Sequence, residues 1–202
     1  MNPISIYAEL TPNPMTMKFV ANRQLHEGEA VEFGMEDDLS VSPLAEKLLN
    51  FPFVENVFVS GHFVTITRND KIEWDMVAMD VREFLTDYFK NDGQVLIDGA
   101  DITEINKNSK KAEKQIDEAS LNIAGTDTEK KIIDALDEYI RPAVEGDGGS
   151  IDFRKFEDGK VTVVLRGSCS GCPSASSTLK HGVENLLTRM VPEVKEVVAE
   201  EL

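Results

Sequence analysis

The sequence RGSCSGCPS at residues 166–174 decides how the second half of this 202-residue chain is interpreted. It contains Cys169 and Cys172, which are the two cysteines of the chain. The β-branched run at residues 161–165 predicts a strand before it, and a helical pattern begins near Ala175. At the N-terminus of a helix, unpaired N–H groups and the helix dipole favour a thiolate over a thiol. We therefore interpret residues 166–174, called the cysteine motif below, as the functional site.

The charge pattern around the cysteine motif points the same way. Between Asp158 and Glu184 the sequence contains no carboxylate. The same window contains three basic residues, Lys160, Arg166 and Lys180. In a chain with a formal net charge of -16, this predicts a locally electropositive site that would stabilise thiolates or an anionic metal cluster. For each basic residue taken singly, uneven surface charge is the alternative.

Length and composition indicate a globular chain of one or two domains, with 41% hydrophobic and 29% charged residues. A pI near 4.6 argues against binding to nucleic acid or to an anionic membrane, because little positive charge is available to neutralise phosphates. No apolar run in the sequence approaches the roughly 20 residues that span a bilayer. The first nine residues resemble neither a signal peptide nor a transit peptide, so we expect a cytoplasmic protein with reduced thiols.

The first part of the chain predicts a small domain that contains both strands and helices. Ser42 and Pro43 predict the start of a short helix that ends near Asn50. Apolar residues at helical spacing predict a longer helix over residues 74–89, and we interpret residues 27–39 as a polar connection. The expected strands cover residues 4–10, 15–22, 54–59 and 63–68.

Residues 99–127 carry many charges, few large apolar side chains and no aromatic residue. Such a stretch cannot bury enough apolar surface to offset its ordering entropy, which predicts a flexible, charged linker. We therefore expect two small domains of the α/β (α+β) class, each a short sheet with packed helices. The expected boundaries are 1–98 for the first domain, 99–127 for the linker and 128–202 for the second domain.

The second domain is expected to begin with a helix after Thr126 and Glu129, which form a capping-box pattern. Residues 145–150 read EGDGGS and predict a glycine-rich turn, which lacks the Lys-Ser/Thr ending of a phosphate loop. An Asp-Gly turn at residues 158–159 predicts a hairpin. A helix after the cysteine motif and a last strand at residues 194–199 complete the domain.

These motifs carry a resemblance to a known family. The segment from Ile140 through the glycine-rich turn and the hairpin to Ala175 resembles the NifU-like C-terminal domain of iron–sulfur cluster scaffold and carrier proteins. The Thr-Pro-Asn-Pro loop at residues 11–14, together with residues 42–45 and 57–59, resembles the N-terminal domain of the Nfu branch of that family. The two resemblances together cover nearly the whole chain except the linker.

The resemblance implies that the motif binds a [4Fe–4S] cluster between two protomers and passes it to apo-proteins. On that basis Cys169 and Cys172 are the cofactor-binding and metal-binding residues, and the partners are an upstream cluster donor and apo iron–sulfur client proteins. We expect no enzymatic activity, since His26, His62 and His181 are scattered through the sequence. The N-terminal domain contains no cysteine, so we hypothesise that it is a docking or regulatory module.

The number of thiols agrees with this implication. A typical iron–sulfur cluster takes four protein thiolates, and one chain offers two. Two copies related by a two-fold axis would supply four, so cluster binding should be linked to formation of a homodimer. A cluster held at the edge of a subunit can leave by ligand exchange, which suits a carrier.

Two alternatives stay open at this point. A thiol–disulfide oxidoreductase also uses a C-x-x-C pair at a helix N-terminus, although thioredoxin-like folds place more strands and helices after that pair than are expected here. A structural zinc site shared by two chains would use the same four thiolates.

Overall fold

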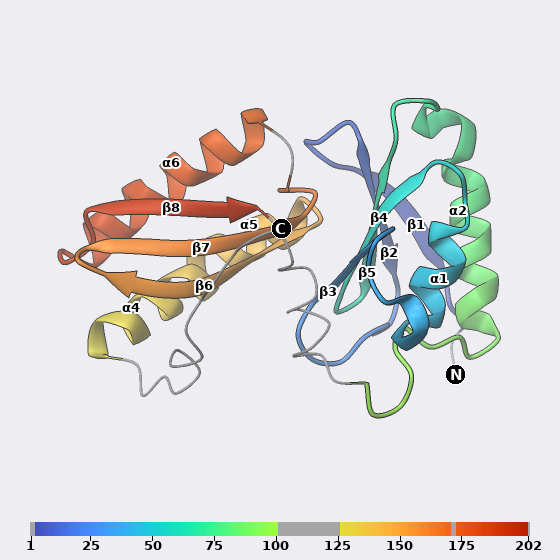
Figure 1. The fold of residues 1–202 in the computed structure, drawn as a ribbon, viewed down its shortest axis with the longest axis horizontal. Helices are drawn as coiled ribbons and strands as arrows, with labels where there is room; N and C mark the ends of the chain where they lie inside the picture. The colour runs from blue at the N-terminus through green and yellow to red at the C-terminus, as the bar shows by residue number, and fades with distance from the viewer. Residues whose placement is uncertain (1–2, 101–125, 171–172, 202) are drawn as a thin grey trace. The chain divides into compact units, whose positions relative to one another are not determined.

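The computed structural model describes residues 3–100, 126–170 and 173–201, without the side chains of residues 173–178 and 201 (Figure 1). The chain divides into two compact units, residues 1–109 and 110–202, and each has its own hydrophobic core. The fold class is therefore the expected one, an α+β protein of two units. Most of the predicted linker lies outside the described residues, and the boundaries at residues 98 and 128 stay a prediction.

The N-terminal unit contains a five-stranded antiparallel sheet with helices packed on one face (Figure 1). The strand order is β1-β2-β5-β4-β3. Helices α1 (Pro43–Leu49) and α2 (Trp74–Lys90) cover the face, and a short 3-10 turn, η1 (Leu39–Val41), precedes α1. The strands are β1 (Ile6–Leu10), β2 (Thr16–Ala21), β3 (Val31–Gly34), β4 (Val54–Ser60) and β5 (Phe63–Arg68).

Local signals at the start of α1 are confirmed. Ser42 is the N-cap, and its hydroxyl accepts a hydrogen bond from the Ala45 N–H at 3.2 Å. Strand β3 was missed, because the interpretation of residues 27–39 as a polar connection was wrong at Val31–Gly34. This strand is only four residues long, and it forms because it pairs with β4. Pairing between distant segments gives no pattern in the local sequence.

The core of the N-terminal unit lies between the sheet and the two helices. Its largest fully buried side chains include Phe19 on β2, Leu48 on α1 and Leu85 on α2. Trp74 begins α2 and packs edge-on against Phe19, with ring centroids 6.1 Å apart. In the parts of the chain that are described, we find no helix with the length and apolar character needed to cross a membrane.

The C-terminal unit contains a three-stranded sheet of order β6-β7-β8 with helices packed on it (Figure 1). Strands β6 (Gly149–Glu157) and β7 (Lys160–Gly167) form an antiparallel hairpin, and β8 (Glu196–Glu201) runs parallel to β7. The helical segments are α4 (Asp127–Ala135), a π-helical turn η3 (Leu136–Ile140), α5 (Arg141–Gly146) and α6 (Pro173–Met190).

Two predicted local motifs of this unit are confirmed. The Thr126 hydroxyl accepts from the Glu129 N–H at 3.2 Å, and the Glu129 carboxylate accepts from the Thr126 N–H at 2.7 Å, which completes the capping box. Asp158 and Gly159 both have positive φ, 52° and 87°, as a two-residue hairpin turn with the right twist requires.

Two boundaries differ from the prediction. The helical segment continues through η3 and α5 to Gly146, into the glycine-rich turn predicted at residues 145–150. The Arg141 N–H bonds to the Leu136 carbonyl, five residues back. Pro142 has no N–H with which to continue the regular ladder, which explains the wider turn at this place. Strand β8 begins at Glu196 rather than Val194, because the Val194 N–H closes a turn onto the Val191 carbonyl at 2.9 Å.

Candidate functional site

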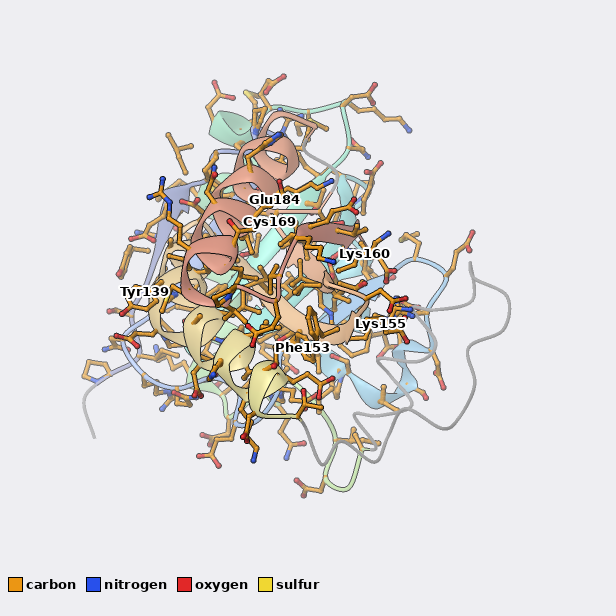
Figure 2. The ribbon with its side chains drawn as sticks, turned by 90° about the vertical axis from the view of Figure 1, so that its left-hand side faces the viewer. Tyr139, Phe153, Lys155, Lys160, Cys169 and Glu184 are labelled. Atoms are coloured by element: carbon orange, nitrogen blue, oxygen red, sulfur yellow. The ribbon has the colours of Figure 1, made fainter. Side chains whose placement is uncertain are left out.

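Cys169 lies just beyond the C-terminal end of β7 (Figure 2). Gly167 ends the strand with a φ of 68°, and the Ser170 N–H donates to the Gly167 carbonyl at 3.1 Å. This turn directs the Cys169 side chain into the core of the C-terminal unit, where it is 5% exposed. Cys172, the other predicted ligand, lies outside the described residues, so the ligand role of the pair stays a prediction.

Helix α6 begins at Pro173, four residues after Cys169. This is two residues before the predicted start near Ala175, and proline at the first helical position loses no hydrogen bond. The first turn of α6 contains no acidic residue, so no carboxylate of its own offsets the positive end of the helix dipole. The cysteine motif therefore connects a strand end to a helix start that favours negative charge.

The turn at residues 146–149, called the glycine loop below, packs against the cysteine motif. Gly149 is paired with Gly167 in the β6–β7 register. The Ser168 hydroxyl donates to the Asp147 carbonyl at 2.5 Å, and the Ser168 N–H donates to the Gly148 carbonyl at 3.2 Å. The residue that precedes Cys169 is thus hydrogen-bonded to two successive carbonyls of the loop.

Gly149 contacts the cysteine directly. A Cβ at this position would lie 2.6 Å from the Arg166 carbonyl oxygen, 2.9 Å from the Cys169 Sγ and 3.3 Å from its Cβ. Because the first of these atoms belongs to the backbone, it cannot move aside as a flexible side chain would. The position therefore requires glycine for the close approach of two backbone segments.

Arg141 links the elements on either side of the glycine loop in the chain. This guanidinium pairs with Asp137 of η3 at 2.8 Å and with Asp152 of β6 at 3.3 Å. Burial works against the charged form of Arg141, but its hydrogen bond to Asp137 and the attraction of both carboxylates leave its pKa raised above the usual value. Arg141 therefore joins the elements that enter and leave the glycine loop.

The three basic residues of the predicted electropositive surroundings lie at different distances from the cysteine motif. Lys160 begins β7, so the length of an eight-residue strand, roughly 23 Å, separates it from the cysteine end. Lys180 follows the start of α6 by about two helical turns. Arg166 is the one of the three basic residues that lies at the motif end of β7. The backbone carbonyl of Asp147 also meets the motif, through its hydrogen bond from the Ser168 hydroxyl.

The three histidines lie on different elements of the described chain. The His26 Nε2 lies 2.9 Å from the Glu29 carbonyl oxygen in the N-terminal unit. His62 lies in the turn between β4 and β5, and His181 is exposed on α6. Among the described residues, no group of three or more His, Cys, Asp or Glu side chains gathers that could hold a metal ion.

Comparison with known sequences gives the family. Residues 6–92 match the domain described as "Scaffold protein Nfu/NifU N terminal", and residues 132–198 match the "NifU-like domain". These two matches correspond to the two units of the fold. The chain belongs to the Nfu/NifU-like family, as the motifs predicted.

Individual relatives agree with this assignment. The human protein named "NFU1 iron-sulfur cluster scaffold homolog, mitochondrial" is 33% identical over 193 residues, which cover 95% of this chain and 70% of that protein. The Arabidopsis thaliana "NifU-like protein 5, mitochondrial" is 32% identical over 197 residues, or 96% of this chain and 67% of that protein. In other relatives the match covers a smaller share of the relative's length, for example 60% of a Drosophila virilis protein.

Among solved structures, the chain is similar to a NifU-like protein from Saccharomyces cerevisiae, determined by solution NMR. The sequence identity is 22% and the TM-score is 0.43, over 48% of this chain and 88% of that chain.

The expected cytoplasmic location is corrected by the same comparison. The human and Arabidopsis relatives are named as mitochondrial proteins. The expectation rested on the residue types of the first nine positions. Targeting segments are not part of a folded unit, so no feature of the fold could have corrected it.

Proposed function

We propose that this chain is an iron–sulfur cluster scaffold and carrier. It holds a labile [4Fe–4S] cluster between Cys169 and Cys172 of two protomers and delivers it to apo-proteins. The observation that carries the proposal is the placement of Cys169 at the junction of β7 and the N-terminal end of α6, packed against the glycine loop. Relatives that are named as iron–sulfur cluster scaffolds support it.

The cluster is the cargo of the protein rather than a resident cofactor. Each chain contributes two thiolates and a typical cluster takes four, so a second copy of the chain completes the ligand set. The positive end of α6 and the absence of acidic residues in its first turn suit a cluster with net negative charge.

Delivery follows from ligand exchange. A client thiolate forms a new Fe–S bond as the Fe–S bond to Cys169 or Cys172 breaks. The electron pair of the broken bond stays on the departing thiolate, which takes a proton from solvent. No electrons pass between cluster and protein, so the transfer needs neither an oxidant nor a reductant and no enzymatic turnover.

The N-terminal unit contains no cysteine and so cannot supply thiolate ligands. We also propose that it docks client proteins, which would raise their concentration near the cysteine motif. Several apolar side chains support this role because they are exposed rather than packed into the core. Leu10 is 86% exposed and Met76 is 71% exposed, and Tyr7 and Met79 are also exposed.

Anaerobic reconstitution with iron and sulfide tests the main proposal. Mössbauer spectroscopy, metal and sulfide analysis and sizing are applied to the same sample, beside Cys169→Ser and Cys172→Ser variants. We expect about one four-iron cluster per dimer, lost in both variants, whereas Ser150→Ala in neighbouring β6 keeps it. Binding of zinc alone would favour a structural zinc dimer. A readily cycled disulfide without metal would favour a thiol–disulfide oxidoreductase, and either result contradicts the scaffold function.

A further inference from the structure

Ser168 connects the cysteine motif to the glycine loop. It directly precedes Cys169 and is 2% exposed. Its hydroxyl and its N–H donate to the carbonyls of Asp147 and Gly148, at 2.5 and 3.2 Å. Because both hydrogen bonds come from one residue and end on neighbouring carbonyls, they hold the turn before Cys169 in one position relative to the loop.

The same hydroxyl lies 3.9 Å from the Cys169 Sγ. A hydroxyl has one proton, and a carbonyl oxygen can only accept, so the Ser168 proton is used in the bond to Asp147. The Ser168 hydroxyl therefore donates its proton to the glycine loop, while its oxygen lies next to the Cys169 sulfur.

Gly149 borders the sulfur as well. The absence of a side chain there allows the loop backbone to approach so closely that a Cβ would be 2.9 Å from the Sγ. Within the described part of the chain, the Ser168 oxygen and the Gly149 backbone both limit the direction of the thiol group. The Ser168 oxygen keeps its place through its hydrogen bond to the loop, and the Gly149 backbone is held by the loop and by its pairing with Gly167.

We infer that Ser168 is a positioning residue for Cys169. It acts through the glycine loop, not as a ligand, and holds in place the turn from which the Cys169 thiolate has to reach iron. The inference rests on the proposed function. Groups that orient a metal ligand typically change metal affinity by about 10- to 100-fold when they are removed. We expect Ser168→Ala to lose its cluster about tenfold faster than the original chain.

The experiment compares Ser168→Ala with Ser150→Ala in the full chain. Ser150 is a matched control because it is 3% exposed on the adjoining strand, and its hydroxyl has no hydrogen-bond partner within the described part of the chain. The first measurement is the rate of cluster loss to an iron chelator under anaerobic conditions. The second is the rate of Cys169 alkylation by iodoacetamide in a cluster-free Cys172→Ser background, corrected for the globally unfolded fraction.

Faster cluster loss and faster alkylation in Ser168→Ala, with neither in Ser150→Ala, support a positioning role. A Ser168→Ala chain that is only less stable, with the rate of cluster loss and the corrected alkylation rate both unchanged, overturns it. Ser168→Thr keeps the hydroxyl, so a folded Thr variant that loses its cluster at the Ala rate also overturns it. If the original chain binds no cluster, the proposed function fails, and the alkylation rates still decide whether Ser168 positions Cys169.

Discussion

Replacing Gly149 with alanine tests the packing at the centre of the site. The added Cβ would lie 2.6 Å from the Arg166 carbonyl oxygen and 2.9 Å from the Cys169 Sγ. The carbonyl belongs to the neighbouring strand of the same hairpin, so it cannot retreat without breaking the pairing of Gly149 with Gly167. The structure must respond by moving the glycine loop away from the cysteine motif.

The size of the effect follows from this geometry. An extra carbon in a well-packed site lowers the free energy of unfolding by about 1–3 kcal/mol. Because the clash at Gly149 is with backbone, we expect Gly149→Ala to lower it by about 2 kcal/mol or more. For a unit of this size, each kcal/mol lowers the melting temperature by about 4–8 °C. We therefore expect the C-terminal unit to melt roughly 10 °C lower, and its cluster to be lost faster.

The single tryptophan makes the assay specific for each unit. Trp74 lies in the N-terminal unit, so its fluorescence follows the unfolding of that unit alone, whereas far-ultraviolet circular dichroism follows both. Gly149→Ala should leave the fluorescence transition unchanged and lower the other transition. Gly146→Ala and Gly182→Ala are matched controls, because within the described part of the chain their added Cβ would meet no atom within 4 Å beyond their chain neighbours and their own helix backbone.

The two controls should keep or slightly raise the stability of the C-terminal unit, since alanine is favoured over glycine in a helix by up to about 1 kcal/mol. Gly149→Ala could instead have the same melting temperature and the same cluster lifetime as the original chain. In that case the close approach of the glycine loop to Cys169 plays no part in stability or in cluster retention.

Three further predictions concern other parts of the chain. Deleting residues 1–98 should leave cluster binding intact but slow transfer to client apo-proteins; equal transfer rates to every client tested would remove the docking role. Gly93→Ala should destabilise the N-terminal unit by about 1–3 kcal/mol, because its Cβ would lie 2.4 Å from the Tyr88 ring. A lower midpoint in the unfolding transition followed by Trp74 fluorescence, with the C-terminal transition unchanged, would support this prediction. An unchanged midpoint would show that the Tyr88 ring moves aside freely. Glu184→Ala should destabilise the C-terminal unit by about 1–3 kcal/mol, since the Glu184 carboxylate accepts from the Val197 N–H of edge strand β8 at 3.0 Å. Glu184→Gln keeps a hydrogen-bond acceptor, so it should lower the free energy of unfolding by less than Glu184→Ala does. Equal losses of stability in the two variants, measured by urea unfolding, would contradict this reason.

Signals that act over a few residues predicted much of the fold. The Ser42 cap, the capping box at Thr126 and the turn at Asp158 were recognisable because each is completed within about four residues. Strand β3 was not, since Val31–Gly34 is a short edge strand whose partner lies more than twenty residues further along the chain.

The surroundings of the candidate site were harder to predict. The sequence window placed Lys160 with the motif, but an extended strand carries a residue far from its neighbours in the sequence. Counting back from the hairpin turn would place Gly149 opposite Ser168. The observed partner is Gly167, because a bulge between Phe153 and Lys155 shifts the register by one residue. A bulge of this kind has no reliable local signal.

The sequence alone therefore determined the family, the two-unit α+β fold and the pair Cys169 and Cys172 as the predicted ligands, since these follow from residue types and short spacings. Only the tertiary structure decided what borders Cys169. Asp147 and Gly149 meet the cysteine motif because the hairpin brings together segments about twenty residues apart, and Ser168 donates hydrogen bonds to the backbone carbonyls of Asp147 and Gly148. Every residue type offers such a carbonyl, so contacts of this kind leave no pattern in the sequence and are decided by strand register and packing.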